Sequence, residues 1–393
     1  MRSEHCGVVG VVLFCIMAAS LAGASPQAER ISAAEAVRIA REWLRDPQAQ
    51  VASLSLDTAD GRATNGTSWF LTLRGADGAT HLVSVDARAG VVLFWGKLSP
   101  EYGDSAHEPE PTVSLTESHA IAVEFAQERH PGFRSGRWVP EIGGPYHGQR
   151  RRIWAWYEVI DPVSGALGPW DLSVEVSEDR PEVVGFYRSS LAPILVGTRP
   201  SIGRRAIVSI ARRYALLDPA RYPINQIILR VAMDDHGSQR LVWECLQVLG
   251  VDPDGGVMMY GVVHDAHTGE PLYPIAPFGG GKHPVRQISF PRRCSVLLEP
   301  GDKAMTTPLV PPDLRPDGLW VRAEHLRAVD GVRVDVTKHA VTVVARDRTM
   351  SGSDLGAEWR SDGWWVPLRR VSDRLGWRVE WDNVKKVAIV HVK

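Results

Sequence analysis

The residue group with the clearest potential for chemistry is a short run of histidines and an acid near the middle of the chain. His264, Asp265 and His267 stand within four residues, and imidazole and carboxylate groups are common zinc ligands. A zinc site needs three or four ligands with a set geometry, and the spacing here fixes no further ligand. Asp265 and Gly269 also belong to an Asp-Ala-x-x-Gly pattern typical of a tight turn. The sequence therefore indicates a structural turn here and predicts no metal ligand.

Other acidic and nucleophilic residues point away from catalysis. Asp234 and Asp235 lie in MDDHGS, which is typical of a turn, and His119 and Glu124 are not four residues apart on their expected helix. The chain has no HExxH, GxSxG, Walker A or dinucleotide-binding motif. Acid and base residues of a glycosidase are not recognisable from spacing alone. We expect a protein that is not an enzyme, with no catalytic residue and no cofactor.

The first residues predict export. Arg2 precedes an apolar run over residues 7–21, and Ala22-Gly23-Ala24 forms a small-residue cleavage site. This order is typical of a secretory signal peptide over residues 1–24, cleaved near Ala24. The apolar run is shorter than the ~20 residues of a spanning helix, and no later segment is apolar enough to span a bilayer. We expect a mature chain that is secreted or extracytoplasmic, with no membrane span.

Two cysteines remain after such a cleavage, because Cys6 and Cys15 leave with the signal peptide. Cys245 and Cys294 would meet an oxidising compartment, where disulfides form and persist. A bridge between them would close a loop of about 50 residues and stabilise the fold by about 4 kcal/mol. The alternative is two buried, unpaired thiols, and the sequence leaves both open.

Composition limits the class of partner. The 393 residues include 45 Lys and Arg against 46 Asp and Glu, a formal net charge of −1. Nucleic-acid-binding domains usually carry a strongly basic surface, so the balance argues against a nucleic-acid partner. The length suggests two to four domains.

Tryptophans are concentrated near the C-terminus, with four in residues 362–383. Trp377 and Trp381 share one strand face at period 2, and together with Trp365 we expect them to form a core. Trp364 neighbours Trp365 and should point to the opposite face. We expect Trp359 to lie in a loop. Trp359 and Trp364 are the candidates for exposed binding aromatics, able to stack on the sugar rings of a cell wall.

Internal repeats show how the chain is organised. ISAAEAVRIAREWL (residues 31–44) has apolar residues on one helical face, Ser32 at the expected N-cap and Glu35 at the place that completes a capping box. VSLTESHAIAVEFA (113–126) repeats this pattern 82 residues later, and IGRRAIVSIARRYA (202–215) repeats the apolar positions without the capping box. Alternating apolar segments follow each helix and predict antiparallel strands. VDARAG (85–90) and HDAHTG (264–269) form matching turns.

These features resemble the PepSY family: a helix with an early Glu-Ala pair, a strand bearing Trp, and a closing strand that turns at Asp-Ala-x-x-Gly. The resemblance covers residues 31–98, 112–190 and 200–275 as three PepSY-like repeats. VEVSEDRPE replaces the turn motif in the second copy, and the third carries an insertion around residues 252–256. The resemblance implies a small helix-on-sheet module that binds or inhibits outside the cytoplasm. The linkers expected between modules are residues 99–111 and 276–284, which are rich in Pro and Gly.

Residues 318–345 and 363–390 match each other at an offset of 45. Trp320 corresponds to Trp365, and each half reads as a strand, a short helix, a glycine and two strands. The second half, with VPLR (366–369), LG (375–376) and VEWD (379–382), resembles the copper amine oxidase N-terminal (stalk) domain, here residues 287–393. In the first half Arg322 and Ala323 stand in place of Pro-Leu. The resemblance implies a non-catalytic unit, because the copper chemistry of such oxidases resides in another domain.

The expected fold class is α+β, with three tandem helix-on-antiparallel-sheet units followed by a duplicated β-α-β-β stalk-type domain. The expected function is that of a secreted, non-enzymatic modular binding protein at the bacterial cell envelope, with a cell-wall polymer or another exported protein as partner. Two alternatives are a secreted protease inhibitor or propeptide-like folding helper, and a wall-active enzyme.

Overall fold

The computed structural model describes residues 30–57, 67–98, 112–130, 132–133, 138–141, 151–188, 193–234, 236–251, 257–276, 284–288, 290, 294–299, 303–345, 348–360 and 362–392. The expected signal peptide and the expected linker at 99–111 lie outside these residues, as does most of the linker at 276–284. Among the helices of the described residues, none combines the length and the apolar content needed to cross a bilayer.

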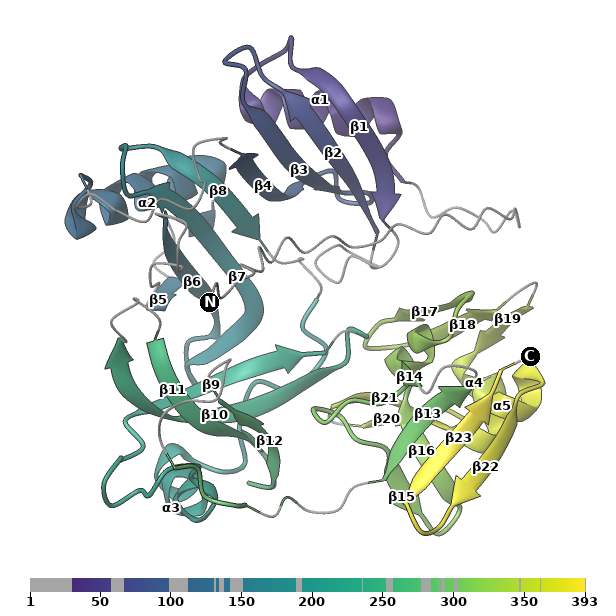
Figure 1. Cartoon of the computed structure of the whole chain (residues 1–393). Coiled ribbons are helices and arrows are strands. Elements are labelled where there is room, and N and C mark those ends of the chain that lie inside the picture. The colour runs from purple at the N-terminus through teal and green to yellow at the C-terminus, as the bar shows by residue number, and fades with distance from the viewer. Residues whose placement is uncertain are drawn as a thin grey trace, which may run out of the picture.

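The protein is α+β, and up to residue 275 a helix followed by four strands occurs three times (Figure 1). The first set is α1 (Ala33–Leu44), β1 (Gln50–Asp57), β2 (Ser68–Arg74), β3 (Thr80–Asp86) and β4 (Val92–Leu98). The second is α2 (Leu115–Arg129), β5 (Trp138–Glu141), β6 (Arg151–Asp161), β7 (Ala166–Ser177) and β8 (Val183–Arg188). The third is α3 (Arg204–Tyr214), β9 (Gln226–Met233), β10 (Gln239–Val251), β11 (Val257–Asp265) and β12 (Pro271–Ile275). We call these sets units 1, 2 and 3.

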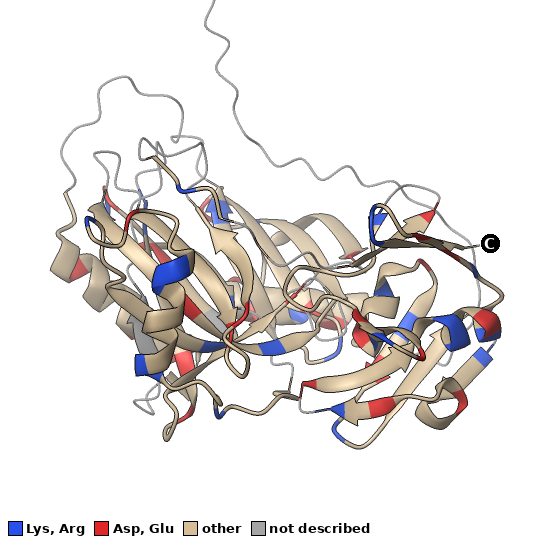
Figure 2. Ribbon diagram, turned by 90° about the horizontal axis from the view of Figure 1, so that it is seen from below, with Lys and Arg blue, Asp and Glu red and all other residues tan. Residues whose placement is uncertain are grey.

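Consecutive strands within each unit pair antiparallel, and two further contacts join the units into one sheet. Strand β4 of unit 1 pairs antiparallel with β8 of unit 2, and β7 makes a short parallel contact with β9 of unit 3. Acidic and basic residues are interspersed along the ribbon of the molecule (Figure 2). The three units are therefore connected through hydrogen-bonded strand edges.

Each helix is fixed to its sheet by an equivalent backbone hydrogen bond. In each unit the N–H of the residue before the N-cap donates a hydrogen bond to a backbone carbonyl. This carbonyl belongs to the residue that directly follows the unit's third strand. The pairs are Ile31 to Ala87 (2.8 Å), Val113 to Glu178 (3.0 Å) and Ile202 to Ala266 (3.0 Å). This bond sets where each helix starts relative to the strands it covers.

The predicted Asp-Ala-x-x-Gly turns are present. In unit 3 the Asp265 carboxylate accepts hydrogen bonds from the N–H groups of His267 and Thr268, both at 2.8 Å. Gly269 N–H donates to the Asp265 carbonyl, and its φ of +74° is a conformation that favours glycine. Asp86 makes the same contacts in unit 1. In unit 2 Ser177 takes this place and accepts from Asp179 N–H.

The helix caps differ from the predicted capping boxes. Ser32 and Ser114 cap α1 and α2 by accepting from the N–H three residues on. In α1 the reciprocal bond is absent because the Glu35 carboxylate pairs with Arg38 at 2.6 Å. Helix α3 has Gly203 at its N-cap and no side-chain cap.

Units 1 and 2 share one hydrophobic core. Trp43 of α1 lies 4.8 Å from Phe186 of β8 and 6.2 Å from Phe125 of α2, measured between ring centroids. Phe125 in turn stacks against Trp95 of β4 at 5.9 Å. The helix of each unit thus packs on aromatic residues of the other.

The described residues after 275 form three small sheets, of which one is central for the site below. Its strands are β15 (Asp313–Arg315), β16 (Gly318–Arg322), β21 (Gly363–Pro367) and β20 (Glu358–Arg360), in that order. A second sheet has the order β14 (Lys303–Ala304), β13 (Ser295–Glu299), β23 (Val387–His391) and β22 (Arg378–Asp382), and a third β17 (Val332–Val336), β18 (Val341–Ala345) and β19 (Arg348–Ser351). The helical segments are η3 (Ala323–Ala328), α4 (Gly352–Leu355) and α5 (Leu368–Leu375). We call this part the C-terminal domain.

The two halves of the C-terminal domain meet at equivalent residues. In the antiparallel pair β16–β21, Val321 lies opposite Val366, its counterpart at the offset of 45. The indole N–H of Trp320 donates to Asp317 at 3.2 Å, and that of Trp365 donates to Asp362 at 2.9 Å. The duplication is thus visible in strand pairing and in side-chain contacts.

Candidate functional site

The two tryptophans predicted as exposed binding aromatics lie side by side. Trp359 is in β20 and pairs directly with Trp364 of β21, so the prediction that Trp359 lies in a loop was wrong. Their ring centroids are 5.5 Å apart with the ring planes at 69°, an edge-to-face contact. Trp359 is 37% exposed and Trp364 is half-buried. The counterpart of this pair in the first half is aliphatic, Leu314 and Leu319.

One ring of this aromatic pair is held rigidly. The indole N–H of Trp364 donates to the Thr337 carbonyl at 2.8 Å, and its ring packs at the edge of the domain core. Trp359 rests against this fixed ring. Because tryptophan has few rotatable bonds, such a pair offers a large contact area at a small cost in conformational entropy. The arrangement can bind a flat, partly apolar ligand surface.

The other tryptophans correct part of the predicted core. Trp365 and Trp377 are buried, but they do not share one core: Trp377 belongs to the core of the C-terminal domain, whereas Trp365 packs against unit 3. Trp381 is 40% exposed. Trp377 precedes β22 and Trp381 lies within it, so the two do not belong to one strand as expected. Among the described residues, strand β22 has a neighbouring strand on one side alone, and this edge position leaves the Trp381 ring partly in solvent.

The remaining predicted site residues stay apart or serve the fold. Cys245 is buried in β10 and Cys294 lies before β13, and both are free thiols. Burial raises the pKa of Cys245 to about 12, so this thiol is unreactive at neutral pH. The imidazole Nδ1 of His264 contacts the Gly269 carbonyl at 3.1 Å within the turn. The described residues contain no group of three or more His, Cys, Asp or Glu side chains arranged to hold a metal ion.

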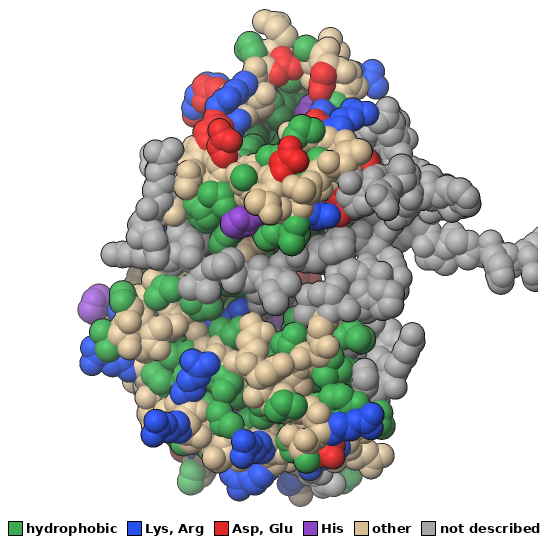
Figure 3. Space-filling model, turned by 90° about the vertical axis from the view of Figure 1, so that its left-hand side faces the viewer, with side chains coloured by type: hydrophobic (Ala, Val, Ile, Leu, Met, Phe, Trp, Pro, Cys, Tyr) green, Lys and Arg blue, Asp and Glu red, His purple; other side chains and the backbone are tan. Residues whose placement is uncertain are grey.

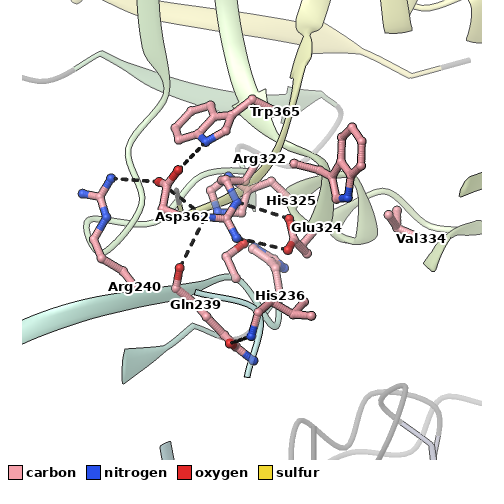
Figure 4. Close-up of polar contacts among 12 residues, drawn as sticks. His236, Gln239, Arg240, Arg322, Glu324, His325, Val334, Asp362 and Trp365 are labelled. Atoms are coloured by element: carbon pink, nitrogen blue, oxygen red, sulfur yellow. Dashed lines mark hydrogen bonds and ion pairs between the residues drawn. The ribbon is translucent and has the colours of Figure 1, made fainter. Parts of the chain in front are cut away.

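A second feature, which the sequence did not reveal, is a buried ionic cluster between unit 3 and the C-terminal domain (Figure 4). Its centre is Arg322, at the end of β16, whose side chain is 0% exposed. The guanidinium bonds to Glu324 at 3.1 Å and to Asp362 at 3.4 Å within the C-terminal domain. It also donates to the Gln239 carbonyl of unit 3 at 3.3 Å. Although burial opposes its charge, the two carboxylates raise the pKa of Arg322, so it stays charged.

Asp362 extends this cluster across the boundary. Its carboxylate lies 3.5 Å from Nη2 of Arg240, and Nε of Arg240 lies 3.5 Å from the turn residue Asp265. On its other oxygen Asp362 accepts the indole N–H of Trp365. The turn of unit 3 is thereby linked through one arginine to strand β21.

Asp234 forms a second contact across the same boundary. Its Oδ2 accepts from the Thr307 hydroxyl at 2.7 Å and lies 3.1 Å from Nε2 of His325, which is fully buried. Burial alone would raise the pKa of Asp234, but the hydrogen bond and charge of His325, with the donors Thr307 and Ser238, lower it overall.

Apolar side chains complete this contact. Trp320 and Trp365 pack against Val242, Val263 and Leu272 of unit 3. The ionic cluster and these side chains together fix the C-terminal domain on unit 3. The sequence did carry a signal: Arg322, with Ala323, departs from the Pro-Leu of the second half, and Arg322 is the residue that makes the deepest polar contact.

Comparisons with known proteins add little to this geometry. No family model matches the chain, and no curated protein matches it either. Among solved structures, the Bacillus megaterium YpeB C-terminal domain is similar at 15% identity and a TM-score of 0.39, over 63% of this chain and 98% of that one. A similarity at this level assigns neither a fold nor a function. The PepSY and stalk-domain resemblances therefore stay predictions.

Proposed function

We propose that the protein is a secreted, non-enzymatic modular binding protein of the bacterial cell envelope, built from three PepSY-like units and a stalk-type domain. The observation that carries this proposal is the aromatic pair Trp359 and Trp364 on the surface of the C-terminal domain. An apolar surface that a folded domain keeps exposed and rigid is typical of an interaction site.

The ligand that best fits this pair is a wall glycan. A sugar ring presents a face of C–H groups and an edge of hydroxyl groups, and the C–H face stacks on indole rings. Trp359 offers the accessible ring. The ring of Trp364, which is fixed by its hydrogen bond to Thr337, supports the Trp359 ring from one side. The β17–β18 turn, which contains Thr337, also exposes Lys338, whose ammonium group can meet the hydroxyl edge.

The test is co-sedimentation of the mature chain with purified peptidoglycan. We expect Trp359→Ala to reduce retention about tenfold, which corresponds to about 1.4 kcal/mol of lost contact. Trp381→Ala is the matched control, because it removes an equally exposed indole from a different sheet of the same domain. Equal retention of the wild type and both variants would exclude the aromatic pair as the binding site. Inhibition of secreted proteases without retention on peptidoglycan would favour the inhibitor alternative instead.

A further inference from the structure

Helix α3 carries an unusual concentration of positive charge. Four of its eleven residues are arginines, Arg204, Arg205, Arg212 and Arg213, and all four are exposed. The helix contains no acidic residue. Helix α3 lies at the lower left of Figure 1, and Figure 3 shows the molecule from that side. In the lower part of this view, Lys and Arg side chains predominate over acidic ones. We call the solvent-facing side of α3 the basic face.

The arginines of the basic face are aligned along the helix. Arg205 and Arg212 are seven residues apart, which places them within about 20° around the axis and about 10 Å along it. Ser209 lies exposed between them, and Arg213 borders the same side. On the opposite side Ile207 and Ala211 are buried against the sheet. The basic face is therefore a straight row of positive groups.

These arginines are not neutralised within the described residues, where none of the four takes part in an ion pair. Helix α1 is different, since Arg38 pairs with both Glu35 and Glu42. In the sequence, the exposed Arg199 precedes α3 and the exposed Arg221 follows it, and both add positive charge. The exposed Asp218 adds one negative charge. Since the whole chain has a net charge of −1, the basic face is a local feature and not a consequence of an overall excess.

We propose that the basic face of α3 binds a linear polyanion of repeating phosphate groups. The planar guanidinium pairs with phosphate oxygens through two parallel hydrogen bonds, which favours arginine for this recognition. A row of two arginines about 10 Å apart matches a chain with repeating charge better than a single small anion.

A lipid bilayer fits the basic face less well than a polymer. Helices that lie on membranes insert an apolar side between the lipids. The apolar side of α3 is already occupied by contacts with the sheet of unit 3, through Ile207 and Ala211. The exposed side offers charge without an aromatic or aliphatic anchor.

The test uses the full mature chain and long-chain inorganic polyphosphate as the probe, with affinity measured over a range of salt concentrations. Arg205→Ala/Arg212→Ala should weaken binding roughly tenfold per arginine, because each loses charge-assisted hydrogen bonds. The slope of log affinity against log salt should fall by roughly 0.7 per arginine, as for single-stranded polyanions.

Arg369→Ala/Arg374→Ala is the control. It removes the same charge from the exposed side of α5, which also contains Asp373. The control should bind polyphosphate like the wild type, and Arg205→Lys/Arg212→Lys should keep the salt slope while losing affinity. Trp359→Ala should leave polyphosphate binding unchanged, so a failed glycan site and a failed basic face are distinguishable.

Three results would overturn the proposal. Equal losses in the α3 and α5 variants would show general charge attraction. Equal affinity for polyglutamate would show that phosphate is not recognised. Binding to vesicles of phosphatidylglycerol with no binding to polyphosphate would identify a membrane surface as the partner.

Discussion

At the scale of single residues, Arg322 marks where the two halves of the C-terminal domain differ. Its counterpart in the second half, at the offset of 45, is Pro367, which is the N-cap of α5. Arg322 instead enters the boundary with unit 3 and lies directly against Gly363, where a Cβ atom would overlap the guanidinium. Glycine at this position is therefore needed for two reasons: its φ of +129° and the space that it leaves.

Gly363→Ala and Gly318→Ala form a matched test of this contact. Gly318 is the counterpart of Gly363, with a similar φ of +135° and no atom within 4 Å of the place that a Cβ would take. Both variants should lose about 1 kcal/mol or more from backbone strain. Gly363→Ala should lose about 2 kcal/mol more, because the displaced arginine leaves buried carboxylates unpaired. Denaturant unfolding measures both, and equal losses would show that Arg322 adjusts without cost.

The Asp234 carboxylate should make the stability of the protein depend on pH in the acidic range. Its pKa is lowered in the folded state, so its contribution is fully present above the unfolded value of about 3.9. The contribution is lost as pH falls through the lower, folded-state value. Each unit of pKa shift corresponds to about 1.4 kcal/mol.

The measurement is denaturant unfolding at a series of pH values from neutral to acid. Asp234→Asn keeps the side-chain shape but does not ionise, so its stability should depend less on pH in the acidic range. Parallel pH profiles of the wild type and Asp234→Asn would contradict the assigned role of this carboxylate.

At the scale of elements, the three helices differ in their N-caps more than in their packing. Ser32→Ala and Ser114→Ala each remove the side chain that accepts the otherwise free N–H group three residues on, and should destabilise the protein by about 1 kcal/mol. Gly203→Ser should stabilise it by a few tenths of a kcal/mol, because Gly203 already has N-cap geometry and open space. Thermal unfolding gives all three values. A loss of stability in Gly203→Ser would mean that the hydroxyl does not reach the N–H groups of α3.

Local sequence patterns predicted many of the helices and turns. Serine caps, apolar faces at helical period and Asp-Ala-x-x-Gly turns identified α1, α2 and the turns at Asp86 and Asp265, because each depends on residues close in sequence. Contacts between distant residues left no such pattern. The sequence therefore revealed neither the β4–β8 pairing nor the place of Trp359 in a strand. Arg322 was recognised as a departure from the repeat, but its partner Gln239 lies 83 residues away.

At the scale of the whole molecule, units 1 and 2 should unfold together. Phe186 of unit 2 is almost fully buried and contacts both Trp43 of unit 1 and Phe125 of unit 2. Phe186→Ala should cost about 3–5 kcal/mol, as truncations of buried aromatic residues do. Native-state hydrogen exchange should show faster exchange in α1 as well as α2. Faster exchange confined to residues 112–188 would show that the two units are energetically separate.

Two strand joints among the described residues follow one rule, whereas the parallel β7–β9 contact joins strands that hold different places in their units. Trp95 of β4 lies opposite Phe186 of β8, and these residues hold the same position in their units, nine residues after the turn residues Asp86 and Ser177. Val321 and Val366 lie opposite each other in the same way. Contact of a surface with its own copy is the geometry of a two-fold symmetric homodimer. Gene duplication and fusion of self-pairing ancestors would produce this arrangement twice, with the interface of each ancestral dimer now enclosed within a single polypeptide.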